Sequence, residues 1–369
     1  MSRPWYQIDD IDRIDSPALV FYPDRVKQNI DSLLGMIDDP RRLRPHVKTH
    51  KTREVVAMLM EKGVDKFKCA TIAETAMVAS IGASDILLAY QPVGPKVERL
   101  VELIQKYPGS HFATLVDDKD AANVIASAAR ASSINIDVFI DLNVGMNRTG
   151  ILPDEGALEL YEYCSALEGI RPIGLHAYDG HIYDSLLEVR ESRAARAFEP
   201  VEVLRKNILK KGFAEPVIVA GGSPTFPFYA RQKNIECSPG TFVFWDAGYA
   251  EYGEQAFHPA ALLISRVISC PAQDVVCTDL GHKSVAAEKE LGRRVLFLNA
   301  PQAEFVSQSE EHLTLRLSNG HGLRIGDVLY GLPFHICPTC ALYEKAHTIK
   351  DGRLSGEWRI IARDRMITI

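Results

Sequence analysis

The sequence contains no long hydrophobic run, and this absence excludes a membrane-spanning helix. The apolar stretch at residues 260–264 is typical of the longest ones, far short of the roughly 18 residues that a span requires. The first ten residues include Asp9 and Asp10, where a signal peptide would have its apolar stretch. We therefore expect a cytoplasmic protein that does not associate with membranes.

An excess of positive charge is also missing. The chain has 42 Lys and Arg against 48 Asp and Glu, for a net charge of −6, so nucleic acid is not an expected partner. The seven cysteines are scattered and odd in number, which favours free thiols in a reducing compartment over a disulfide framework.

No internal repeat, low-complexity tract or Gly-x-Gly-x-x-Gly turn is present. The glycine motif usually follows the first strand of an open dinucleotide-binding sheet, so such a sheet is not favoured. Instead, short β-rich runs alternate with helical patterns, which predicts a parallel sheet. Eight such runs close a (β/α)8 barrel of TIM type. The predicted strands are 43–47, 66–70, 85–89, 111–116, 136–140, 171–177, 216–220 and 235–238.

The pattern changes near residue 255. Beyond it we predict strands at 261–269, 274–278, 294–298, 312–317, 327–330, 347–350 and 357–361, which indicate a mainly-β domain. The fold class is therefore α/β: a barrel followed by a C-terminal mainly-β domain. We place the barrel at 23–255 and the β domain at 256–369, joined by an N-terminal strand within 1–22.

Unusual residue types gather where the predicted barrel strands end, which is where barrel active sites lie. Lys48 ends the first strand, Arg148 follows the fifth, and Tyr178 and His181 follow the sixth. Two glycine turns follow strands seven and eight, and their backbone amides and hydroxyls suit a phosphate. The turns are 221–225 and 239–241, and their hydroxyl donors are Ser223, Thr225 and Thr241.

Lys48 has two interpretations. A lysine that ends an apolar strand is desolvated, which favours the neutral amine and Schiff-base formation with an aldehyde cofactor. Alternatively, Lys48 and Lys51 are surface lysines in a basic loop with Arg41, Arg42 and Arg44.

The motif RPHVKTHK at residues 44–51 resembles the signature of pyridoxal-phosphate enzymes with the alanine-racemase fold. More specifically, it resembles the branch that holds D-threonine aldolase and eukaryotic-type D-serine dehydratase. The resemblance continues through SPALV at 16–20, KFKCAT at 66–71, GMNRTG at 145–150 and PFHICPT at 333–339, and thus covers nearly the whole chain.

The resemblance implies that pyridoxal 5′-phosphate (PLP) forms a Schiff base with Lys48. It implies that Arg148 contacts the ring oxygen of PLP and that Tyr178 lies beside its pyridine ring. It also implies that the phosphate is held by Gly222, Ser223, Gly240 and Thr241. Racemases of this fold have an arginine that faces the pyridine nitrogen, and Ser238 stands at that position here. This difference disfavours a racemase.

The resemblance also implies a metal at His335 and Cys337. A histidine and a thiolate favour zinc, with manganese or magnesium as alternatives, and a bend at Pro338 would let both side chains of an extended segment reach one ion. Cys337 and Cys340 also match a Cys-x-x-Cys redox pair.

We therefore predict a lyase that acts on D-3-hydroxy amino acids, first as a D-threonine aldolase that yields glycine and an aldehyde. His181 is the candidate base for this reaction, and Lys48 would serve the alternative D-serine dehydration. A racemase and a non-catalytic PLP-binding protein are further alternatives. The resemblance also implies a homodimer.

Overall fold

The computed structural model describes residues 3–253, 256–318 and 322–365. No helix in these ranges is long and apolar enough to cross a membrane. The chain forms two compact units, which we call the barrel unit and the β unit. The barrel unit comprises Leu33–Lys48, Val56–Gly240 and Asp364–Ile369, and the β unit comprises Met1–Ser32, Thr49–Val55 and Thr241–Arg363.

The barrel unit contains a seven-stranded parallel sheet with its strands in chain order. Leu87, Leu115, Phe139 and Val219 lie on four of these strands and form a buried cluster. The strands are β2 (Lys66–Cys69), β3 (Asp85–Leu88), β4 (His111–Val116), β5 (Ile136–Leu142), β6 (Ile170–Ala177), β7 (Val217–Ala220) and β8 (Ile235–Cys237).

Residues 43–46 occupy the place of the first predicted strand without forming a regular one. Leu43 bridges Cys237 of β8, and His46 bridges Lys68 of β2. The amide of Arg44 donates to the Cys237 carbonyl at 2.8 Å, and the amide of Lys68 donates to the Pro45 carbonyl at 2.9 Å. This segment therefore connects the two outer strands of the sheet. Pro45 has no amide hydrogen, and the chain turns into a 3₁₀ helix at Val47–Thr49, so the pairing stays limited to isolated bridges.

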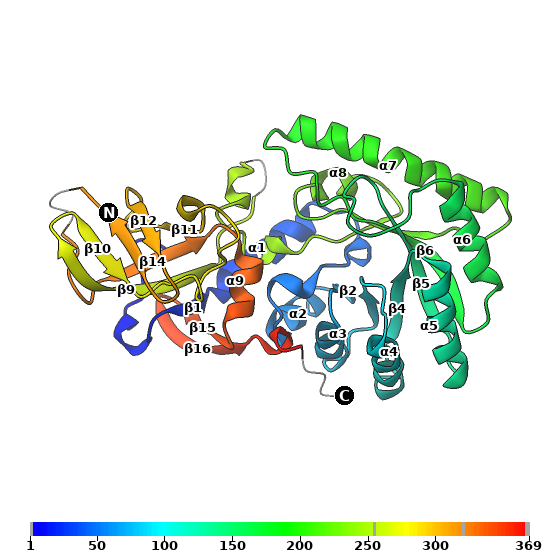
Figure 1. Ribbon diagram of the computed structural model, residues 1–369, viewed down its shortest axis with the longest axis horizontal. Helices are drawn as coiled ribbons and strands as arrows, with labels where there is room; N and C mark the ends of the chain where they lie inside the picture. The colour runs from blue at the N-terminus through cyan, green and yellow to red at the C-terminus, as the bar shows by residue number, and fades with distance from the viewer. Residues whose placement is uncertain (1–2, 254–255, 319–321, 366–369) are drawn as a thin grey trace. The chain divides into compact units, whose positions relative to one another are not determined.

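Helices follow the strands, and α4, α5 and α6 lie outside β4, β5 and β6 (Figure 1). In α5, Ala122, Ile125, Ala126 and Ala129 are buried, which is the spacing of one helix face turned toward a sheet. Asp118 caps its first turn by accepting from two backbone amides. The helices of this part of the chain are α2 (Arg53–Met60), α3 (Ile72–Ala79), α4 (Pro95–Lys106), α5 (Lys119–Ala131), α6 (Glu155–Ala166), α7 (Leu187–Lys210) and α8 (Phe226–Ala230).

The β unit is built on a sheet that contains strands from both ends of the chain. The first strand, β1, pairs antiparallel with β9 and parallel with β15. In chain order, helix α1 (Pro23–Gly35) follows the first strand of this sheet, and helix α9 (Ile336–Leu342) lies between its strands β14 and β15. Its strands are β1 (Ala18–Phe21), β9 (Ala261–Ala272), β10 (Val275–Thr278), β11 (Val295–Phe297), β12 (Glu304–Gln308), β13 (Leu313–Arg316), β14 (Val328–Pro333), β15 (Lys345–Lys350) and β16 (Arg353–Arg359).

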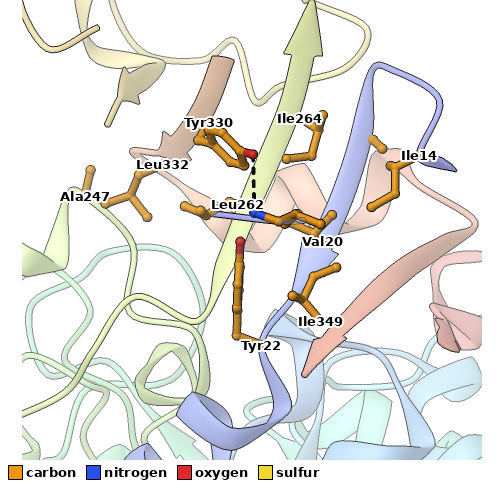
Figure 2. Close-up of a cluster of buried hydrophobic side chains, with 11 residues drawn as sticks. Ile14, Val20, Tyr22, Ala247, Leu262, Ile264, Tyr330, Leu332 and Ile349 are labelled. Atoms are coloured by element: carbon orange, nitrogen blue, oxygen red, sulfur yellow. Dashed lines mark hydrogen bonds between the residues drawn. The ribbon is translucent and has the colours of Figure 1, made fainter. Parts of the chain in front are cut away.

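A buried cluster on this sheet joins side chains that are distant in sequence (Figure 2). Val20 of β1 is opposite Leu262 of β9, and Ile349 of β15 packs into the same cluster. The Tyr330 hydroxyl accepts a hydrogen bond from the Ile8 amide at 3.4 Å. Because apolar burial dominates stability, the N-terminal segment is held to the C-terminal strands chiefly by this cluster.

In the β unit, strands β12 and β16 differ most from the sequence prediction. Strand β12 was not predicted, because its residues are mostly exposed and show no alternation of buried apolar positions. Strand β16 begins at Arg353, four residues before the predicted 357–361. Asp351 and Gly352 have positive φ values of 50° and 74°, which form a tight hairpin turn. The Asp-Gly pair was a sequence signal for this turn.

Candidate active site

Tyr178 is the centre of a group of cations at the carboxyl end of the barrel strands. Its ring follows β6, and Lys48 Nζ lies over it at 5.4 Å from the ring centroid. The guanidinium carbon of Arg148, from the loop after β5, lies 5.1 Å from the centroid, and Lys68 Nζ of β2 lies 5.2 Å from it. The structure thus brings together three of the predicted residues, Lys48, Arg148 and Tyr178. It adds Lys68, which the sequence analysis did not propose.

Two glycines allow the Tyr178 ring to take this place. A Cβ atom on Gly180 would lie 2.5 Å from ring atoms of Tyr178, and a Cβ atom on Gly222 would lie 3.3 Å from one of them. Side chains at these positions would displace the ring. Gly222 is therefore at the site, as predicted from the turn after the seventh strand, and here it makes room for the ring.

A buried histidine–aspartate pair lies beside the cations. His176 Nδ1 and Asp141 Oδ1 are 2.7 Å apart, and both residues line a pocket with Arg148 and Tyr178. Burial, together with the charge of Lys68, lowers the pKa of His176. Burial opposes ionisation of Asp141, but its bond to His176 lowers the pKa of that carboxyl. A neutral His176 beside an ionised Asp141 follows, with the proton on Nδ1.

The glycine turns after β7 and β8 contact each other through Ser223. The Gly240 amide donates to Ser223 Oγ at 3.1 Å, and the Gly222 amide donates to Thr225 Oγ1 at 3.2 Å. Thr241 belongs to the β unit. Gly222, Ser223 and Gly240 therefore form one set of amide and hydroxyl groups, of the kind that binds phosphate.

Polar atoms at this site lack partners within the described residues. Nε2 of His176 and Oγ of Ser238 are buried and make no hydrogen bond there. Such groups are costly unless a ligand or water satisfies them. A polar, anionic cofactor suits a site with these atoms, three cations and a glycine-lined turn, so the residues fit PLP.

His181, the predicted base, packs against the loop that carries Arg148. A Cβ atom on Gly145 would lie 2.9 Å from His181 Nε2, so the ring closely approaches this glycine. His181 Nδ1 has no partner among the described residues, and burial, with the charge of Arg193, lowers the pKa of His181. A neutral imidazole with a free nitrogen is able to accept a proton.

The predicted metal ligands lie in the β unit, at the start of α9. Cys337 Sγ is 3.1 Å from Thr49 Oγ1 and 3.6 Å from Thr241 Oγ1. His335 contacts Cys337 through its side chain and Glu288 through Nδ1. Burial opposes the charge on His335, but its bond to Cys337 raises the pKa of His335 to about 9.

The expectation of an extended His-x-Cys segment with a bend at Pro338 is wrong. His335 precedes α9 and Cys337 lies in its first turn, where proline is tolerated because no intrahelical partner is needed for its nitrogen. No disulfide joins Cys337 and Cys340, which are both thiols.

Within the described residues, His335 and Cys337 are the two candidate metal donors. No group of three or more His, Cys, Asp or Glu side chains there is arranged to hold an ion. A carboxylate on one imidazole nitrogen is the usual way in which a metal-binding histidine is oriented. With Glu288 at Nδ1, His335 has Nε2 for a ligand. One nitrogen and one sulfur donor fit zinc, with the remaining positions left for water or substrate.

Several residues of the two sites were not predicted from the sequence. Lys68, the His176–Asp141 pair, Thr49 and Glu288 received no role. A signal was available for Lys68, because Lys66 and Lys68 alternate in an otherwise apolar strand and must share one face of it. Glu288 gave no signal, because its contact with His335 joins residues 47 positions apart.

Comparison with known proteins identifies the family of both parts of the chain. Residues 22–247 match the family described as alanine racemase, N-terminal domain, and residues 260–349 match the putative serine dehydratase domain. A D-threonine aldolase of Arthrobacter sp is 28% identical over 366 residues, which covers 96% of this chain and 94% of that protein.

Solved structures agree with this fold. D-Threonine aldolase from Filomicrobium marinum superposes with a TM-score of 0.89 at 24% identity and covers 98% of this chain and 99% of its own. A D-threo-3-hydroxyaspartate dehydratase, a cysteine-to-alanine mutant in the metal-free form, gives a TM-score of 0.82 at 23% identity, with 94% and 97% coverage. A histidine-to-alanine mutant of that dehydratase matches equally well.

The expected alanine-racemase fold and the expected family are thereby confirmed. The chain belongs to the alanine-racemase N-terminal-domain family and combines that domain with a serine-dehydratase-like β domain, as a homologue of D-threonine aldolases and hydroxyaspartate dehydratases.

Proposed function

We propose that this protein is a PLP- and metal-dependent lyase of D-3-hydroxy amino acids. The preferred candidate reaction is retro-aldol cleavage of a D-threonine-type substrate. The observation that carries the proposal is the convergence of Lys48, Arg148 and Lys68 on the Tyr178 ring, beside glycine turns suited to a phosphate. A lysine amine beside a phosphate site is the arrangement that an aldehyde phosphate cofactor requires.

Each group of the barrel unit has a role in this proposal. PLP, when bound, supplies an electron sink for the carbanion left by bond cleavage at the α-carbon. Lys48 Nζ provides the amine that bonds the cofactor aldehyde, and Arg148 provides positive charge at the ring oxygen. Gly222, Ser223 and Gly240 would hold the phosphate. His181 would accept the proton of the substrate hydroxyl.

His335 and Cys337 would hold the metal, which would act as a Lewis acid toward the substrate hydroxyl. In the hydroxyaspartate dehydratase structures described above, the substituted histidine and cysteine are also two residues apart. That protein's cysteine mutant is described as metal-free. The same spacing at His335 and Cys337 supports this pair as the metal ligands here, and a nitrogen with a thiolate makes zinc the first choice.

Dehydration of a D-serine-type substrate is the second candidate reaction. It is favoured by the match of residues 260–349 to a putative serine dehydratase domain and by the thiol at Cys337. In this case Lys48 would remove the α-proton. Ser238 cannot supply the cation that racemases of this fold place at the pyridine nitrogen, which argues against a racemase.

Product analysis distinguishes the reactions. The purified protein, loaded with PLP and zinc, is incubated with D-threonine, D-serine and D-3-hydroxyaspartate, and their L-enantiomers serve as controls. Glycine plus an aldehyde indicates an aldolase, whereas a keto acid plus ammonia indicates a dehydratase. Lys48→Ala should abolish both. Turnover of none of the D-substrates by the loaded protein would refute the proposal, and racemisation without cleavage would replace it.

A further inference from the structure

Lys68 is a buried amine in the barrel interior that the roles assigned above do not use. It lies on β2, two residues after Lys66, and its side chain shares a face with that of Lys66. Lys66 forms an ion pair with Glu236, whereas Lys68 is 3% exposed and lies over the Tyr178 ring. The two lysines thus occupy different depths of the same barrel face.

Lys68 has two cations close to it, and the two nearby carboxylates are already bonded to other groups. Lys48 and Arg148 lie over the same ring. The nearby carboxylates already have other partners: Asp141 bonds His176 at 2.7 Å, and Asp179 accepts from Thr225 Oγ1 at 2.9 Å. Burial, followed by the charge of Lys48, lowers the pKa of Lys68 to about 7, against the opposing influence of the two carboxylates.

A buried Lys68 amine with two further cations over the same ring requires an anion as its partner if it is to carry its charge. Lys68 lies as close to the Tyr178 ring as Lys48 does, so its partner is the part of the ligand that lies beside this ring. For the proposed cofactor this part is the ring with its ionised hydroxyl, because the phosphate belongs at the glycine turns.

We propose that Lys68 is a second cofactor-binding cation, which pairs with the ionised ring hydroxyl of PLP and takes up a proton from the buffer when PLP binds. The inference rests on the proposed function, because it requires that PLP binds at Lys48. Its chemistry balances: the buffer acid supplies one proton, Lys68 Nζ receives it, and no covalent bond of Lys68 changes.

The proton uptake has a defined pH range. At pH 8 most of a Lys68 amine with this pKa is neutral in the cofactor-free protein, and an adjacent anion favours its charged form. Binding should therefore draw in nearly one proton per site through Lys68. Below about pH 6 the amine is already charged, and this contribution should vanish.

Calorimetric titration of the cofactor-free protein with PLP tests the inference. The measurement is made at pH 8 in two buffers of different ionisation enthalpy, which gives the number of protons exchanged as well as Kd. Lys68→Met should raise Kd roughly tenfold to a hundredfold, as expected for loss of a charge-assisted hydrogen bond, and should reduce proton uptake by about one relative to wild type. Lys68→Arg should largely retain affinity but also lose the linked proton, because arginine stays charged.

Lys66→Met is the matched control, since Lys66 lies on the same strand face but pairs with Glu236. It should leave both Kd and proton uptake unchanged. Circular dichroism establishes that each variant is folded, and Lys68→Arg keeps the test valid if Lys68→Met does not fold. The inference would be overturned if folded Lys68→Met kept wild-type affinity and proton uptake. It would also be overturned if proton uptake were unchanged in Lys68→Arg. Neither result would affect the proposed function. Failure of the wild-type protein to bind PLP would overturn the proposed function as well.

Discussion

Arg44 Nε donates a hydrogen bond to Glu236 Oε2 at 2.7 Å inside the barrel. The Arg44 side chain is 2% exposed and also bonds both carboxylate oxygens of Asp85, at 2.7 and 3.0 Å. The alternative in which Arg44 belongs to an exposed basic loop is therefore wrong for this residue. Its guanidinium joins the segment before Lys48 to β3 and β8, and so fixes the start of the lysine motif.

We expect Arg44→Met to lower the free energy of unfolding by about 3 kcal/mol, because Glu236 and Asp85 lose their hydrogen bonds to the guanidinium and keep only Lys66 and His111 as charged partners. Urea titration followed by circular dichroism measures the change. Arg41→Met is the matched control. Arg41 pairs with Asp39 at the surface, so its loss should change stability by less than about 1 kcal/mol. Similar losses in both variants would contradict a special role for Arg44.

Stability should depend on pH through His111. Its Nε2 is 2.7 Å from Asp137 Oδ2, and its bonds to Asp137 and Asp85 raise the pKa of His111 from 6.5 to about 9. A raised folded-state pKa contributes stability that is complete below pH 6.5 and is lost as the pH rises through 9. The Tm difference between wild type and His111→Gln should therefore be largest near pH 6 and shrink toward pH 10. His312→Gln, at an exposed position, serves as control; a His111 difference independent of pH would refute the assignment.

Borohydride reduction should fix PLP to one lysine. We expect the label on Lys48, because its amine lies at the mouth with Arg148 and Tyr178. Mass spectrometry of the digested protein locates the label, and Lys51→Arg should leave it on Lys48. Labelling of Lys51 in the wild-type protein would show that the wrong lysine of the motif was chosen.

Metal binding should depend on His335, just before α9, and on Cys337 in its first turn. His335→Ala and Cys337→Ala should each reduce zinc content strongly, as measured by mass spectrometry of metals after dialysis. Glu288→Gln should weaken zinc binding roughly tenfold to a hundredfold, because it removes the carboxylate that orients His335. Cys270→Ser, at an exposed thiol, is the control. Unchanged zinc in both His335→Ala and Cys337→Ala would exclude this pair as the site.

Much of the fold was predictable because local patterns and tertiary packing agree. The alternation of apolar runs and helices predicted β2 to β8 with small errors at their ends, and the amphipathic face of α5 is visible in the sequence. The first barrel position was harder, because Pro45 permits only bridges where a strand was expected. The start of α9 was also misjudged, since a proline in a first helical turn looks like a bend when neighbouring contacts are unknown.

The sequence by itself predicted a barrel of alternating strands and helices followed by a β domain, because periodicity and turn residues are local properties of the chain. Its motifs also resemble those of the alanine-racemase fold, and that resemblance supplied most of the candidate ligands. Only the tertiary structure decided which of these groups meet. It buried Arg44 between two carboxylates, placed Lys68 beside Lys48 and Arg148, and set Glu288 against His335. Those contacts join residues on different strands and loops, and burial then determines which charges are stabilised and which await a ligand.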